Sequence, residues 1–98
     1  MDRTAFEAAL ASEGYEIRSV TMQPNAVNPT HVHPFDARLL VIDGAMTIER
    51  ENAPTQTYRT GETFEMPNGT SHSEAAGEAG ATYVAGRRLP AHRQGTGA

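Results

Sequence analysis

Three histidines are the residues of this chain whose type and spacing best suit chemistry. His31 and His33 are two residues apart, so on a strand both imidazoles point to one face. His72 begins a separate extended segment much later in the chain. Neighbouring strands lie about 4.8 Å apart, so three such imidazoles can surround one ion if these segments pair. Imidazole suits transition metals better than Ca²⁺ or Mg²⁺. His-x-His by itself, however, fits two surface or hydrogen-bonded histidines equally well.

Other polar side chains can complete a pocket around these histidines. Glu74 follows the third histidine by two residues and shares its face in an extended segment. Arg38 either points into the pocket towards a substrate carboxylate or pairs across strands with Asp36 or Glu49. Tyr83 either offers its hydroxyl to the cavity or packs in the core.

The elements that must position these side chains are one helix and many short strands. Thr4 followed by Glu7 has the form of a capping box, and Gly14 can end the helix. Residues 1–14 are therefore predicted as an N-terminal helix, with Phe6 and Leu10 on its buried face. Residues 15–88 alternate in strand fashion between turn signals, which predicts a small β-barrel or sandwich. Residues 89–98 are predicted as a tail.

Several local features of the barrel are also predicted. The phase of alternation changes after Ile17, which suggests a bulge near Arg18 and Ser19. Residues 23–30, with two prolines and two asparagines, are expected to form a loop, and Asp43-Gly44 a hairpin turn. Residues 67–69, Pro-Asn-Gly, predict another turn. Residues 74–80, which are rich in alanine and glycine, should separate this turn from a last strand over residues 81–85.

Composition excludes several classes of partner. The net charge is −4, and all eight basic residues are arginines, which argues against nucleic acid as the main partner. Arg87, Arg88 and Arg93 form the densest basic cluster, interpreted as part of a solvated tail together with His92. The longest apolar run, residues 39–42, is far too short to span a membrane. Without a signal-peptide pattern, a cytoplasmic location is expected. A core this small favours a homodimer.

Two segments resemble the paired motifs of the cupin superfamily. Residues 25–44 are similar to the first motif, with His31-Val32-His33 and a closing Gly44, and residues 61–72 match the second, from Gly61 to His72. The resemblance implies an all-β double-stranded β-helix (jelly-roll) barrel, a dimer, and a metal held by histidines and a glutamate. Ala37 stands at the glutamate position, and the adjacent Asp36 should face the opposite way.

These features leave two functions open. The first is an enzyme that binds a divalent transition metal (Fe, Mn, Ni, Cu or Zn) through His31, His33 and His72 and acts on a small organic substrate. Dioxygenase, isomerase or hydrolase chemistry would suit such a site. The second is a non-catalytic module that binds or senses a small ligand, with or without metal. The missing glutamate favours the second function, and the intact histidines favour the first.

Overall fold

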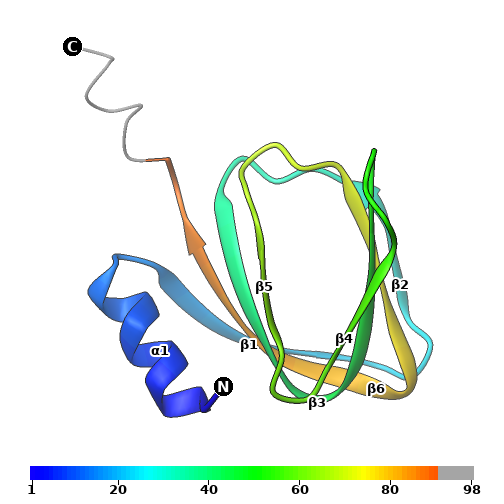
Figure 1. Cartoon of the computed structure of the whole chain (residues 1–98), viewed down its shortest axis with the longest axis horizontal. Helices are drawn as coiled ribbons and strands as arrows, with labels where there is room; N and C mark the ends of the chain where they lie inside the picture. The colour runs from blue at the N-terminus through cyan, green and yellow to red at the C-terminus, as the bar shows by residue number, and fades with distance from the viewer. Residues whose placement is uncertain (91–98) are drawn as a thin grey trace.

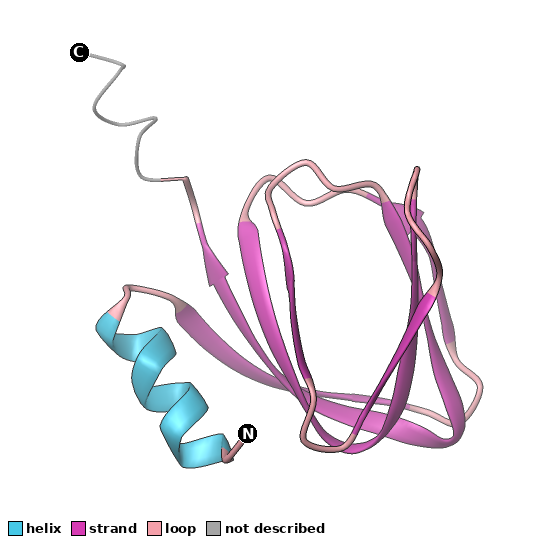
Figure 2. Cartoon of the chain, viewed as in Figure 1, coloured by secondary structure: helices cyan, strands magenta, loops and turns pink. Residues whose placement is uncertain are grey.

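The computed structural model describes residues 1–90, which form one helix and one six-stranded antiparallel sheet (Figures 1 and 2). The elements are α1 (Arg3–Ser12), β1 (Glu16–Met22), β2 (Val27–His31), β3 (Asp36–Arg50), β4 (Gln56–Arg59), β5 (Thr63–Met66) and β6 (His72–Arg88). Within this part of the chain, no helix is long and apolar enough to cross a membrane. The predicted all-β barrel with a short N-terminal helix is confirmed.

Two long strands organise the sheet. β3 and β6 pair along their whole length, from Asp36 opposite Arg88 to Arg50 opposite His72. β1 and β2 pair with successive parts of β6, while β5 and β4 pair with successive parts of β3. The paired strands curve around a common centre, and α1 lies outside them (Figure 1).

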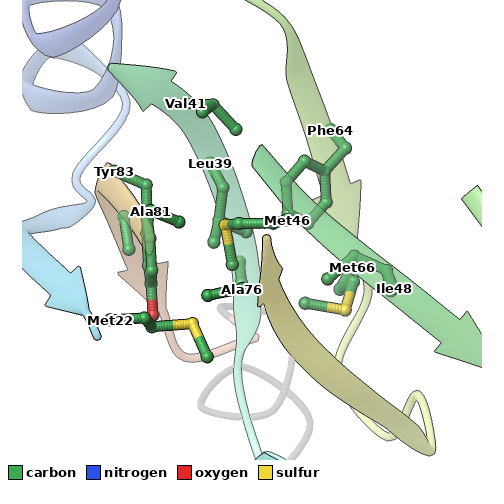
Figure 3. Packing of buried hydrophobic residues seen from close by; sticks show 12 residues of the cluster. Met22, Leu39, Val41, Met46, Ile48, Phe64, Met66, Ala76, Ala81 and Tyr83 are labelled. Atoms are coloured by element: carbon green, nitrogen blue, oxygen red, sulfur yellow. The ribbon is translucent and has the colours of Figure 1, made fainter. Parts of the chain in front are cut away.

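Two apolar clusters lie on opposite faces of this sheet. The interior cluster gathers side chains from β1, β3, β5 and β6, including Met22, Leu39, Val41, Met46, Ile48, Phe64, Met66 and Tyr83 (Figure 3). The outer cluster packs Phe6 and Leu10 of α1 against Leu40 and Val84. Within residues 39–42 of β3, Leu39 and Val41 therefore pack in the interior cluster, whereas Leu40 and Ile42 pack in the outer one. This double burial explains the continuous apolar run 39–42.

The helix begins earlier than its capping-box pattern predicts. Asp2 is the N-cap, and its carboxylate accepts a hydrogen bond from the Ala5 backbone N at 3.2 Å. Glu7 instead forms an ion pair with Arg3 at 2.6 Å, one turn away on the exposed surface. Thr4 as the N-cap was therefore wrong, because Asp2 is an equally good capping residue two positions earlier.

The bulge expected near Arg18 and Ser19 is absent, since β1 pairs with β6 in unbroken register from Glu16 to Met22. The alternation changes phase because the strand touches both clusters. Ile17 packs on the helix side, whereas Val20 and Met22 pack inside the barrel. The loop expected over residues 23–30 is also shorter, because β2 begins at Val27.

Asp43-Gly44 is not a hairpin turn. β3 continues through it as one strand, with register shifts between Val41 and Asp43 and between Gly44 and Met46. Gly44 has φ +81°, and a Cβ on it would lie 2.1 Å from the carbonyl oxygen of Gly80 on β6. The two long strands thus bend together at these glycines. The segment 74–80 accordingly belongs to β6.

Candidate metal centre

The barrel brings the three predicted histidines together. His31 ends β2 and lies directly opposite His72, the first residue of β6, while His33 follows two residues later. One ring nitrogen from each of the three lies within 4.8 Å of the others. A tetrahedral ion with metal–nitrogen bonds of about 2.0–2.1 Å holds its ligand atoms about 3.4 Å apart. Small ring rotations would therefore bring this histidine cluster to coordinating distance.

Hydrogen bonds to the backbone orient two of these rings. Nδ1 of His31 lies 2.7 Å from the carbonyl oxygen of Pro29, and Nδ1 of His72 lies 3.0 Å from that of Thr70. A carbonyl oxygen can only accept, so both Nδ1 atoms carry a proton, and in the neutral rings both Nε2 atoms keep a free lone pair. His72 is 2% exposed, and its Nε2 has no hydrogen-bond partner among the described residues. This orphaned buried acceptor fits a metal ligand.

The third imidazole, His33, stacks on the ring of Phe35 with centroids 4.6 Å apart. Burial lowers its pKa below 6.5, and the nearby His31 and His72 lower it further, against an opposing effect of Glu74. A lowered pKa keeps the ring neutral at physiological pH, which is the form that binds a metal.

Glu74 supplies a carboxylate beside the cluster. It shares the inner face of β6 with His72, as an extended segment requires, and is only 6% exposed. Asn28 of β2 donates a hydrogen bond to its Oε1 at 2.8 Å. Its other oxygen, Oε2, lies 3.6 Å from Nε2 of His72. The carboxylate is therefore held at the edge of the histidine cluster.

Ala37, at the expected glutamate position, and its neighbours on β3 alternate in direction, as the two-residue period of a strand requires. Ala37 points into the barrel, and Asp36 points away, where its Oδ1 accepts from the Asn68 backbone N at 2.9 Å. Arg38 also faces outwards, where it pairs with Glu13 at 3.2 Å. The outward direction therefore agrees with the expected ion pair, but the partner is Glu13 at the end of α1 rather than Asp36 or Glu49.

A cavity of about 470 Å³ opens beside the cluster. It is lined by His31, His33, Glu74 and Tyr83, with apolar walls that include Val20, Phe35, Ala37, Leu39 and Met66. Burial, with a further contribution from Glu74, raises the pKa of Tyr83 to about 12. The Tyr83 hydroxyl therefore stays protonated at neutral pH and can donate a hydrogen bond into the cavity.

Arg87 also lines this cavity, which the sequence interpretation missed. The signal was present: Tyr83, Ala85 and Arg87 continue one alternating row of β6. Treating Arg87 and Arg88 as part of a solvated tail was wrong, since both belong to β6, and Arg88 donates to the backbone oxygen of Glu13 on the other face. Arg93 and His92 lie outside the described residues.

Comparison with known proteins agrees with this architecture. Residues 18–92 match the Cupin domain family. The chain is 33% identical over 69 residues to germin-like protein 9-2 of Oryza sativa subsp. japonica. The aligned residues make up 65% of this chain but only 32% of that protein.

Solved structures share the fold at lower identity. A Rhizobium leguminosarum bv. viciae protein of unknown function superposes with a TM-score of 0.73 at 20% identity, covering 80% of this chain and 73% of that one. A cupin-2 domain containing protein of Shewanella frigidimarina gives 0.63 at 23% identity, covering 76% and 71%. The two sequence motifs, the barrel and the family match all agree. The chain therefore belongs to the cupin domain family.

Proposed function

We propose that this protein binds a divalent transition metal through the Nε2 atoms of His31, His33 and His72 and acts on a small organic molecule in the adjacent cavity. The observation that carries the proposal is the buried Nε2 of His72, which lacks a hydrogen-bond partner and faces two other imidazoles. Fe, Mn, Ni or Cu bound there would suit dioxygenase chemistry, and Zn would suit isomerisation or hydrolysis by Lewis-acid action.

The chain's own residues have separate tasks in this proposal. The backbone carbonyls of Pro29 and Thr70 fix the tautomer and direction of two imidazoles. Asn28 holds the carboxylate of Glu74 beside the histidine cluster, whereas Ala37, at the position of the family's glutamate, contributes no donor atom. The protonated Tyr83 hydroxyl can orient a substrate oxygen, while the apolar walls exclude water.

A non-catalytic ligand-binding module is the second candidate, because Ala37 contributes no donor atom to the barrel interior. Three neutral ligands hold a metal less firmly than three histidines and a glutamate, so a barrel that binds its ligand without metal is consistent with this substitution. The cytoplasmic location and the homodimer stay predictions.

Elemental mass spectrometry of the purified full chain tests the proposal. We expect near-stoichiometric metal, either as purified or after incubation with Fe, Mn, Ni, Cu and Zn salts followed by desalting. The double variant His31→Ala, His33→Ala should lose the metal while keeping its circular dichroism spectrum. The control is His92→Ala, which removes the remaining histidine of the chain and should retain the metal.

Absence of metal from the native chain after every incubation would refute the metal site and leave the ligand-binding module. Equal metal in the native chain and the folded double variant would show that the ion binds elsewhere.

A further inference from the structure

Arg87 carries a positive charge into a cavity whose walls are mostly apolar. The side chain is half-buried at one end of the inner row of β6. Its guanidinium carbon lies 5.0 Å from the centroid of the Phe35 ring. Among residues 1–90, no carboxylate lies within ion-pair distance of it, whereas Arg3, Arg18 and Arg38 each have one.

The two cross-strand neighbours of Arg87 on β6 are Glu16 on β1 and Ala37 on β3. The carboxylate of Glu16 pairs with Arg18 at 3.0 Å, whereas Ala37 lines the same cavity as Arg87. Ala37 stands at the position where the resemblance to the first motif implies a glutamate. With a methyl group there, the space beside Arg87 contains neither a negative charge nor a hydrogen-bond acceptor from this position.

Near Arg87 the cavity therefore favours an anion. Glu74 is the acidic residue among those that line it, and Asn28 already occupies one of its oxygens. A divalent ion on the neutral histidines would add two positive charges to that of Arg87. A guanidinium that stacks on an aromatic ring keeps its edge N–H groups free, and these match a planar carboxylate in a bidentate arrangement.

We infer that the ligand of this cavity is a small organic carboxylate, whose carboxylate group binds Arg87 in the space beside Ala37 while its remainder extends towards the histidine cluster. The cavity of about 470 Å³ accommodates a molecule of that size. This inference deepens the proposed function and rests on it for the histidine end alone, because the Arg87 end requires no metal.

Isothermal titration calorimetry of the full chain tests the inference with succinate and benzoate as probes. Succinamide and benzamide serve as uncharged matches of the same shape, and inorganic phosphate as a non-planar anion. We expect a carboxylate to bind at least tenfold more tightly than its amide, both in the presence of EDTA and after metal loading. Phosphate should bind more weakly than the better carboxylate.

Three variants locate the binding. Arg87→Gln should weaken carboxylate binding about tenfold or more, since it removes a charged donor pair. Arg88→Gln, on the outward face of the same strand, should stay within twofold of the native chain. Ala37→Glu should compete with the probe by pairing with Arg87, and its thermal unfolding shows whether the larger side chain is tolerated.

The outcomes separate this inference from the proposed function. Carboxylate binding that depends on Arg87, in a chain that takes up no metal after any of the incubations, would support the inference and refute the metal proposal. Stoichiometric metal with equal binding of carboxylates and amides, or with Arg87→Gln indistinguishable from Arg88→Gln, would overturn the inference and leave the metal site intact. Tighter binding of phosphate than of either carboxylate would also overturn it.

Discussion

Replacing Gly44 by alanine tests whether β3 and β6 are locked together at their common bend. The residue has φ +81°, and a left-handed conformation costs an alanine about 1–2 kcal/mol. Its new Cβ would also lie 2.1 Å from the oxygen and 2.9 Å from the carbon of the Gly80 carbonyl. These are backbone atoms of a paired strand, so relief requires the two strands to separate, which adds about 1–3 kcal/mol.

The expected loss is therefore about 2–5 kcal/mol, a large share of the roughly 5–15 kcal/mol that stabilises a domain of this size. Gly14→Ala is the matched control, because Gly14 has φ +80° but nothing lies within 4 Å of its Cβ position. That variant should lose only the conformational part of the free energy of unfolding, about 1–2 kcal/mol.

Urea denaturation followed by far-ultraviolet circular dichroism, with EDTA present, measures both variants. With a slope of about 1–3 kcal/mol per molar urea, Gly44→Ala should unfold at a midpoint about 1 M below that of Gly14→Ala. Equal midpoints would refute the argument, since they would show that the strands move apart at no cost and that the bend is not fixed by this contact.

Two further predictions concern the cavity. Asn28→Ala releases the carboxylate of Glu74 and should weaken Zn²⁺ binding about tenfold in competition with a chromophoric chelator. Asn68→Ala is the control and should bind Zn²⁺ as the native chain does, because the Asn68 backbone rather than its side chain contacts Asp36. If Asn28→Ala binds Zn²⁺ as tightly as the native chain, Glu74 does not contribute to the metal site. Absorbance at 295 nm should show a tyrosine titrating near pH 12 that Tyr83→Phe removes. Because burial raises the folded pKa above the ordinary 10, the free energy of unfolding should fall as pH rises from about 10 towards 12. If the absorbance change of Tyr83 occurs near pH 10 instead, its hydroxyl is exposed to water and burial does not raise its pKa.

The sequence alone determined the barrel, the helix and the identity of the histidine cluster. Phe6 and Leu10 recur at helical spacing, and both are buried against the sheet. The turn at Pro67 closes as predicted, with the Thr70 N donating to the Pro67 oxygen. The spacing of His31 and His33 predicted a shared direction, and the resemblance to the two cupin motifs implied that His72 joins them, as the structure shows.

Only the tertiary structure decided which strands pair and which charges face each other. Asp43-Gly44 has the composition of a hairpin turn, yet β6 pairs with the chain on both sides of it, so the strand continues through a bulge. Composition placed Arg87 in a solvated tail, and only the register shows that it lies between Glu16 of β1 and Ala37 of β3. A local pattern reports turn preference and the period of burial, but a cross-strand neighbour comes from a remote segment, and its identity follows from the register of the folded sheet.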